Sequence, residues 1–288
     1  MSSEIAKILR KCMVIRKQVE FFIEQNKQKM LRCDCNELVN RSSLAFIIAT
    51  ICDQQISADI AWEGIPYALY EWLREQGLDF RASVIYKIGV DKLREWFSKY
   101  MMGKWPRRMD EKSREKWLED IPRYIIESCE KIWREYNDDP DSIFAAAGEQ
   151  LSVPLIYFML RQFPGIGPKK ASMIAREFAL DSCLATCLIE RLKERGVNLK
   201  VTHIHFTEVP IDIHVKRVFR RLGFSRYGEP QDFQNLARII YPENPGLVDL
   251  FIWNLGRKVC KKNKCQECPL NNICEEYSKR FKSSEQPP

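Results

Sequence analysis

The chain has 288 residues, of which 45% are hydrophobic and 30% are charged, and its formal net charge at pH 7 is +7. This composition supports a sizeable core and allows two domains, and the positive charge is compatible with a polyanionic partner without requiring one. The longest apolar run, residues 44–52, is too short to span a bilayer, and the N-terminal residues lack the apolar segment of a secretory signal. We therefore expect a cytoplasmic protein that has no membrane partner.

Helical periodicity dominates the first half of the chain, and strand patterns are scarce. The serine pair at 42–43 can cap a helix at 44–52, which is apolar on every side and is expected at the buried centre of a helical bundle. That helix gives way to the polar residues Asp53, Gln54 and Gln55. The other predicted helices of this half are 3–31, 58–74, 90–100, 111–135 and 141–147.

Residues 163–171 read FPGIGPKKA and predict a tight turn between two helices. Gly165 and Gly167 allow backbone angles that other residues avoid, and Pro168 suits the first position of the following helix. The pattern predicts a helix–hairpin–helix over about 155–178. The free amides of such a turn and the positive end of its second helix can hold a phosphate. A plain connector between two helices is the alternative.

The segment after the hairpin gives mixed signals. Residues 183–208 contain a helical stretch, IERLKERG, and then the alternating stretch NLKVTHIHFTEV, which predicts a short hairpin or an extended loop. We expect His203 and His205 to belong to an alternating strand rather than to a metal site. Further on, in VPIDIHVKRVFRRLG, Asp212 is expected to cap a helix that Gly223 closes.

Four cysteines near the C-terminus follow the pattern C-x4-C-x2-C-x5-C. Thiolates at this spacing can converge on one metal centre, and both zinc and a cubane iron–sulfur cluster accept four of them. The loop between the first two cysteines carries three lysines, which we expect to contact a phosphate backbone, with a solvated charge run as the alternative. The cysteines are Cys260, Cys265, Cys268 and Cys274, and the lysines are Lys261, Lys262 and Lys264.

The other seven cysteines show no such pattern. An odd total of eleven cysteines, in a chain without a secretory signal, favours reduced thiols over a disulfide framework. We accordingly expect Cys33, Cys35, Cys183 and Cys187 to be ordinary thiols.

Three features occur in a fixed order, namely PGIGPKKA, IDIHVKRV and the four-cysteine loop. As an ordered set they resemble the endonuclease III branch of the helix–hairpin–helix DNA glycosylases, over residues 40 to 278. The resemblance implies that Lys169 is an amine nucleophile, that Asp212 is an essential carboxylate, and that the four cysteines bind a [4Fe–4S] cluster rather than zinc. It also implies that Gln54 fills the gap left by an extruded base. The residues expected to contact DNA are Gln54, Gln55, Gly165, Gly167, Lys170, Lys261, Lys262 and Lys264.

The same resemblance implies an all-α fold of two helical domains with a DNA cleft between them. Residues 40–205 would form a six-helix barrel that contains the helix–hairpin–helix. Residues 1–39 and 206–288 would form a cluster domain built from both termini.

The implied function is base-excision repair: removal of a damaged base, expected to be an oxidised pyrimidine, followed by β-elimination at the abasic site. The expected partner is double-stranded DNA with a damaged base or an abasic site, bound by a monomer associated with the nucleoid. One alternative is a monofunctional glycosylase for uracil, mismatched thymine or oxoguanine. Another is a non-catalytic helix–hairpin–helix DNA-binding protein, against which the presence of both Lys169 and Asp212 argues.

The sequence also departs from the family pattern. The first cysteine loop is shorter than is common in the family. Lys169 and Asp212 are 43 positions apart, which is well beyond the usual gap in the family, so residues 183–208 resemble an insertion. A tryptophan-containing stretch at 101–118 resembles a second insertion. Thr50 stands where the adenine-mismatch branch carries a catalytic glutamate, which disfavours that branch.

Overall fold

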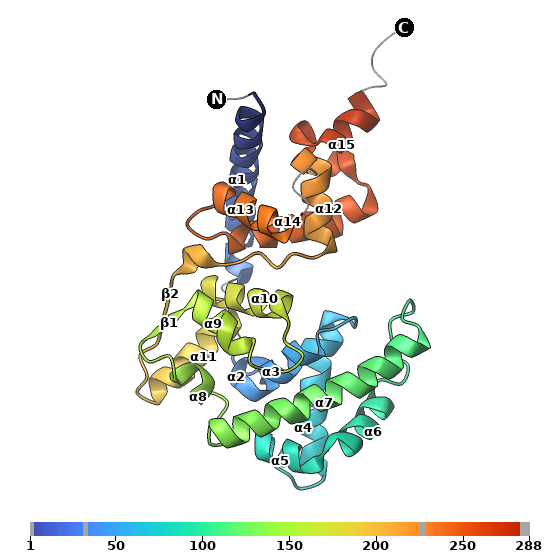
Figure 1. Ribbon diagram of the computed structural model, residues 1–288, viewed down its shortest axis with the longest axis vertical. Helices are drawn as coiled ribbons and strands as arrows, with labels where there is room; N and C mark the ends of the chain where they lie inside the picture. Colours follow the sequence, from blue (N-terminus) through green and yellow to red (C-terminus); the bar gives the residue numbers. More distant parts are fainter. Residues whose placement is uncertain (1–2, 31–33, 225–228, 283–288) are drawn as a thin grey trace. The chain divides into compact units, whose positions relative to one another are not determined.

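The computed structural model describes residues 3–30, 34–224 and 229–282, and these residues are predominantly helical (Figure 1). Within this part of the chain the strands are two short segments, β1 (Gln150–Ser152) and β2 (Lys200–Thr202). The predicted all-α class is therefore confirmed. The α-helices are α1 (Ser3–Met30), α2 (Leu38–Arg41), α3 (Ser43–Cys52), α4 (Ile65–Glu75), α5 (Ala82–Ile88), α6 (Val90–Tyr100), α7 (Glu111–Glu135), α8 (Ser142–Ala145), α9 (Val153–Leu160), α10 (Pro168–Ala179), α11 (Cys183–Glu194), α12 (Ile213–Phe219), α13 (Pro230–Ile240), α14 (Gly246–Lys258) and α15 (Glu275–Tyr277).

Several helix boundaries agree with the sequence patterns. The predicted helices 90–100 and 111–135 match α6 and α7 at both ends. The helix predicted at 58–74 begins as a π-helical segment, Asp59–Gly64, and continues as α4. Helix α5 was not predicted, because its seven residues are too few for a clear helical period.

Helix α3 is the buried centre that its composition predicts. All ten of its residues are buried, and the Ser42 side chain accepts a hydrogen bond from the Ala45 amide at 3.3 Å. A helix that is apolar on every side can remove its surface from water only when neighbours cover it all round. This burial fixes the position at which Asp53, Gln54 and Gln55 leave the helix.

Contacts divide the chain into two compact units, and the division falls inside α10, after Ala171. The hairpin unit comprises Cys33–Ala171 and Asp181–Thr202. The cysteine-loop unit comprises Met1–Arg32, Ser172–Leu180 and His203–Pro288. The boundaries predicted for the two domains stay a prediction.

The core of the cysteine-loop unit joins sequence-distant helices. Cys12, Ile15 and Val19 on α1 pack in one cluster with buried side chains of α12, α13 and α14. The N-terminal helix is therefore part of the same core as the helices that precede the C-terminal cysteines.

The alternating stretch after α11 forms neither of the predicted arrangements. β2 pairs in parallel with β1, with Leu151 opposite Val201, so the partner strand lies about fifty residues upstream. His203 has a left-handed backbone (φ 58°), and Ile204–Phe206 is a 3₁₀ helix. The expectation that His203 and His205 belong to a strand was wrong, because alternation marks a strand without showing where it ends.

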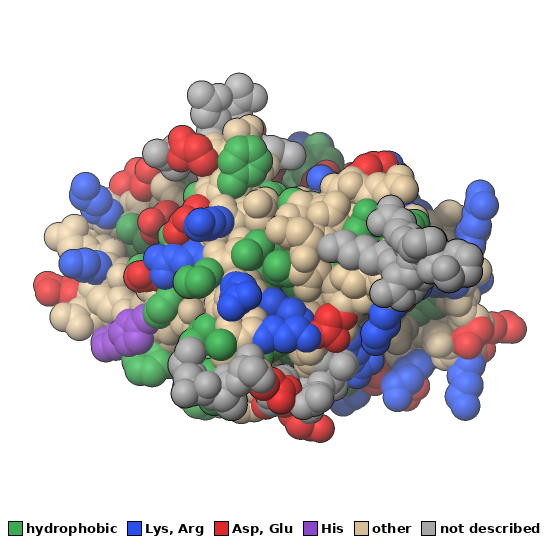
Figure 2. Space-filling model, turned by 90° about the horizontal axis from the view of Figure 1, so that it is seen from above, with side chains coloured by type: hydrophobic (Ala, Val, Ile, Leu, Met, Phe, Trp, Pro, Cys, Tyr) green, Lys and Arg blue, Asp and Glu red, His purple; other side chains and the backbone are tan. Residues whose placement is uncertain are grey.

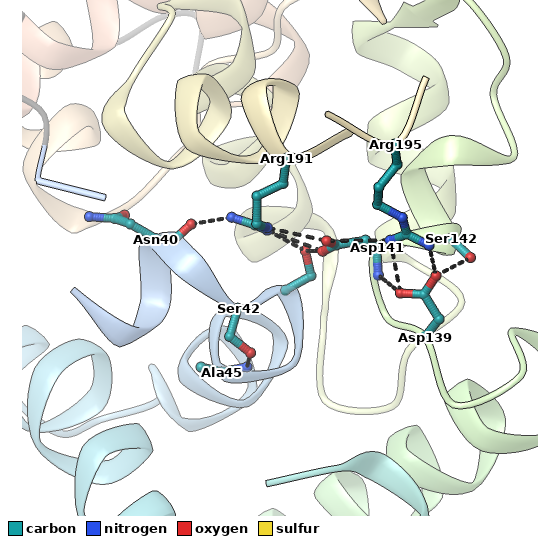
Figure 3. A network of polar contacts seen from close by, with 9 residues as sticks. Asn40, Ser42, Ala45, Asp139, Asp141, Ser142, Arg191 and Arg195 are labelled. Carbon is teal, nitrogen blue, oxygen red and sulfur yellow. Dashed lines mark hydrogen bonds and ion pairs between the residues drawn. The ribbon is translucent and has the colours of Figure 1, made fainter. Parts of the chain in front are cut away.

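A polar network holds α11 against the rest of the hairpin unit (Figure 3). The Arg191 guanidinium donates to the Asn40 carbonyl at 2.5 Å, to both carboxylate oxygens of Asp141 at 3.1 Å, and to the Ser43 hydroxyl at 3.1 Å. One turn later, Arg195 pairs with Asp139. Fork-shaped donation of this kind fixes orientation as well as distance.

A disulfide also anchors α11 and corrects the expectation of reduced thiols at these positions. Cys35 is bonded to Cys187, 152 residues away, and Cys183 is also disulfide-bonded. Such pairing cannot be read from local spacing, because it depends on the tertiary fold. Cys33 lies outside the described residues. Cys12, Cys52, Cys129 and the four C-terminal cysteines are free thiols.

None of the described helices combines the length and the apolar character that a membrane crossing requires.

Candidate nucleic-acid and catalytic site

The turn between α9 and α10 is fixed by contacts within the hairpin unit. Gly165 has a positive φ of 78°, and a Cβ atom added there would lie 2.7 Å from Cδ2 of Tyr124 on α7. A glycine is therefore required for both conformation and space. The Arg161 guanidinium donates to the Ile166 carbonyl at 2.8 Å and closes the turn.

Gly167 meets a different environment from Gly165. Its φ is not positive, and an added Cβ would meet no described atom within 4 Å. Pro168 then opens α10, whose first amides have no partner within the helix. Open space beside Gly167 and free amides at a helix N-terminus form a site that suits a phosphate group.

The two lysines that follow differ in their surroundings. Lys169 is exposed, and no hydrogen bond or ion pair joins its ammonium to another described residue. The Lys170 ammonium donates to the Ile51 carbonyl at 2.7 Å and to the Gly165 carbonyl at 3.0 Å. Burial lowers the pKa of Lys170 to about 8. Lys170 thus ties the end of α3 to the hairpin and keeps one of its three donors for a ligand, whereas Lys169 has all three.

The glutamine pair follows α3 directly. Gln54 is half-buried, and its carbonyl accepts a hydrogen bond from the indole N–H of Trp117 on α7 at 3.0 Å. Gln55 is exposed and has a left-handed backbone with φ 65°. Such a conformation is uncommon for a residue other than glycine, and it is found preferentially at functional positions.

Asp212 lies in the cysteine-loop unit and caps α12, as its position in the sequence predicts. Its Oδ1 atom accepts hydrogen bonds from the amides of His214 at 2.7 Å and Val215 at 2.9 Å. No described residue donates to Oδ2, so this oxygen is available for a substrate. The segment before Asp212 is held by Gln234, whose amide group bonds both the N–H and the carbonyl of Val209 at 2.7 Å.

The four C-terminal cysteines line one small cavity together with Arg221, Val259, Asn271 and Tyr277. Burial raises the pKa of Cys268 to about 11, so its thiolate form requires a nearby cation. Four cysteine sulfurs around one space fit a [4Fe–4S] cluster and also fit zinc. Within the described residues, however, no group of three or more His, Cys, Asp or Glu side chains already stands in ligating positions.

The lysines of the cysteine loop differ in how freely they can contact a ligand. Lys261 and Lys262 are exposed, whereas Lys264 forms an ion pair with Glu267 at 2.9 Å. Figure 2 shows one face of the molecule, on which Lys and Arg side chains are interspersed with Asp and Glu side chains. Of the three lysines, Lys261 and Lys262 are therefore the better candidates for contact with a phosphate backbone.

Three residues that shape these segments were missed by the sequence analysis: Tyr124, Trp117 and Gln234. Each acts through a residue that is distant in sequence, and none belongs to a motif. Trp117 belongs to the tryptophan-containing stretch at 101–118, but no nearby residue in the sequence indicates its hydrogen bond to Gln54.

Comparison with protein-family models finds no match. Three curated proteins named endonuclease III are similar to this chain. The protein from Thermotoga maritima is 32% identical over 104 residues, which are 33% of this chain and 49% of the relative. For Bacillus subtilis the identity is 30% over 103 residues, 32% of this chain and 47% of the relative. For Rickettsia felis it is 28% over 134 residues, 45% and 50% respectively. The chain therefore spans about half the length of the curated relatives it matches.

Solved structures extend the similarity to almost the whole chain. A non-covalent endonuclease III–DNA complex has a TM-score of 0.55 and 18% identity, covering 93% of this chain and 98% of that one. A trapped endonuclease III–DNA covalent intermediate also has a TM-score of 0.55, with 19% identity over 92% of this chain and 98% of that one. At this identity the match establishes the fold. The chain is thus similar in sequence to part of endonuclease III, and it shares the endonuclease III fold.

Proposed function

We propose that this protein is a base-excision-repair DNA glycosylase that also cleaves abasic sites by β-elimination, acting on oxidised pyrimidines in double-stranded DNA. The observation that carries the proposal is the hairpin. It holds an exposed lysine, Lys169, beside open space at Gly167 and the free amides of α10. A phosphate bound at those amides would bring the adjoining sugar within reach of the lysine.

The chemistry follows from the two candidate catalytic side chains. After its ammonium group gives a proton to solvent, Lys169 attacks C1′ of the damaged nucleotide, so that a C–N bond to the protein forms as the bond to the base breaks. The attacking nitrogen gives up a proton and the base leaves protonated. The bond between C1′ and the ring oxygen then breaks, which leaves a Schiff base and, with a proton from solvent, a 4′-hydroxyl group. The carboxylate of Asp212 stabilises the positive charge that develops on the sugar. The resulting Schiff base makes the C2′ proton acidic, and its removal expels the 3′ phosphate.

Gln54 and Gln55 suit the replacement of an extruded base. Extrusion costs a few kcal/mol, which an inserted side chain offsets in part by filling the stack. The left-handed backbone at Gln55 and the hydrogen bond from Trp117 to Gln54 hold this turn in one conformation. These contacts support a role for the pair in DNA binding.

The four C-terminal cysteines would hold a [4Fe–4S] cluster with a structural role. Ligation by these cysteines would fix the loop that carries Lys261 and Lys262, whose exposed ammonium groups would then contact the phosphate backbone. We propose that the protein acts as a monomer. Replacing both lysines with alanine should flatten the salt dependence of DNA affinity by roughly one to two units of slope. An unchanged slope would remove the loop from the interface.

Borohydride trapping tests the proposed function. Wild-type protein incubated with duplex DNA that contains an abasic site should give a covalent complex, because borohydride reduces the Schiff base to a stable amine. Lys169→Gln should abolish trapping and strand cleavage while DNA binding persists through the hairpin amides. Lys170→Gln is the matched control, one residue away, and should still trap.

The alternatives predict different results in the same assay. A monofunctional glycosylase would release a base from one of a panel of damaged duplexes without any trapped complex. A non-catalytic protein would bind abasic DNA but release no base and cleave no strand. Absence of trapping on every abasic substrate would reject the lyase activity.

A further inference from the structure

A second group of cysteines gathers in the hairpin unit, apart from the four-cysteine loop. Cys183, Cys187 and Glu190 are spaced i, i+4 and i+7 on α11 and therefore lie on one face of that helix. Cys35, which precedes α2, reaches the same face, because it is bonded to Cys187. Three sulfurs and one carboxylate thus come from two segments that are about 150 residues apart.

Two separations within this group are close to those between ligands of one tetrahedral zinc ion, although the sulfurs of Cys35 and Cys187 are joined in a disulfide. The sulfur atoms of Cys183 and Cys187 are 3.8 Å apart, and Oε2 of Glu190 is 3.8 Å from the sulfur of Cys35. With zinc–sulfur bonds of about 2.3 Å and tetrahedral angles, two thiolate ligands lie about 3.8 Å from each other. The cysteine pair on α11 therefore already has the spacing of two ligands of one zinc ion.

The surroundings also suit a structural metal ion. Cys187 is buried, Cys35 and Cys183 are half-buried, and Glu190 is exposed. The sulfurs are thus partly shielded from water, and the carboxylate belongs to an exposed side chain next to the sulfur of Cys35. Three thiolates and a carboxylate form a donor set that zinc accepts readily.

We propose that Cys35, Cys183, Cys187 and Glu190 bind one zinc ion when the cysteines are reduced. Each disulfide is opened by a dithiol reductant, which delivers two electrons and two protons and becomes a cyclic disulfide itself. Zinc binding then displaces the protons of the three thiols to solvent. The disulfide form and the zinc form both fasten α11 to the segment before α2, next to the Arg191 network.

Metal analysis of the intact protein, prepared with a dithiol reductant and one equivalent of zinc, tests this proposal. Wild-type protein should retain about one zinc ion per chain after desalting, in addition to any iron. The Cys183→Ser/Cys187→Ser double variant should lose the zinc and keep the iron. Cys265→Ser, in the other cysteine group, should lose the iron and keep the zinc.

Two further variants make the assignment specific. Cys129→Ser removes a buried thiol of the same unit that is remote from the group in sequence, and it should retain the zinc. Glu190→Gln should release zinc to a competing chelator at a lower chelator concentration than wild type. Equal zinc retention by the double variant and the wild type would overturn the proposal.

Thiol mapping on the wild type keeps the test independent of whether the double variant folds. Bound zinc should protect the peptides that contain Cys35, Cys183 and Cys187 from alkylation until a chelator is added. The opposite result would be immediate alkylation of these thiols in the presence of zinc, or disulfides that persist under the reductant with no zinc bound. Either finding would show that these cysteines serve only as disulfide partners.

Discussion

The hairpin around Lys169 and the segment around Asp212 each present one candidate catalytic group, but they hold it in different ways. In the hairpin, the contacts that hold the turn are made by residues other than Lys169: Lys170 donates to two carbonyls, and Tyr124 packs against Gly165. Around Asp212, one carboxylate oxygen is itself the helix cap, and no residue in the described part of the chain donates to the other. Substitution of Lys169 should therefore affect chemistry without affecting folding, whereas at Asp212 a substitution that also removes the helix cap should affect both.

The largest effect is expected at Asp212. Asp212→Asn and Asp212→Ala should both reduce the rate of base removal by several orders of magnitude, because the negative charge is lost. Asparagine still caps a helix, so Asp212→Asn should keep wild-type stability, whereas Asp212→Ala should lose about 1 kcal/mol. Single-turnover base release and urea denaturation measure the two quantities. Base removal by Asp212→Asn at the wild-type rate would limit this residue to capping.

The two hairpin glycines give the next largest difference. Gly165→Ala should lower the free energy of unfolding by about 2–4 kcal/mol, because alanine disfavours a φ of 78° and its Cβ overlaps Tyr124. Gly167→Ala should leave stability within about 1 kcal/mol of wild type but weaken DNA binding, because the new methyl group occupies the proposed phosphate site. Urea denaturation and DNA titration separate the two roles. If the two variants changed stability and DNA affinity to the same extent, the assignment of separate roles to Gly165 and Gly167 would be rejected.

Substitution of Gln234, which holds the segment before Asp212, should have a smaller effect on the free energy of unfolding. Gln234→Leu leaves the buried N–H and carbonyl of Val209 without partners and should cost about 2 kcal/mol. Gln231→Leu on the same helix is the control, because Gln231 is exposed and its side chain donates to the nearby Asn235 side chain at 3.2 Å; it should change stability by less than about 0.5 kcal/mol. If the two variants lost similar amounts of stability, the hydrogen bonds from Gln234 to Val209 would contribute no more than a surface contact.

The smallest effect concerns pH and the anchoring lysine. Because burial lowers the pKa of Lys170 from 10.5 to about 8, the unfolded chain binds more protons than the folded chain between these values. Stability should therefore rise with pH across this window by an amount that Lys170→Met removes. Lys169→Met is the control and should keep the rise. Denaturation midpoints measured from pH 7 to 10 test this, and an identical profile for Lys170→Met and wild type would contradict it.

Features that depend on interactions between residues close together in the sequence could be predicted. The helices α6 and α7, the Ser42 cap and the Asp212 cap depend on residues within a few positions, and all were predicted. The four-cysteine loop is likewise local, so the sequence predicted that its thiols gather, and they line one cavity.

Features that depend on distant partners could not be predicted. The pairing of β2 with β1 and the bond between Cys35 and Cys187 join segments that only the tertiary fold brings together. The different surroundings of the two neighbouring hairpin lysines also depend on a partner that is distant in sequence. Their order in PKK does not show that Lys170 turns toward Ile51 while Lys169 stays exposed.

The central claim is that Lys169, and not its neighbour, forms the covalent bond to DNA. Mass spectrometry of the borohydride-reduced complex tests it directly, because digestion leaves the sugar remnant on the one lysine that attacked. We expect the remnant on Lys169, whose amine is exposed and unpaired among the described residues. A remnant on Lys170 would contradict it, since that amine would have to leave the carbonyls of Ile51 and Gly165 to react.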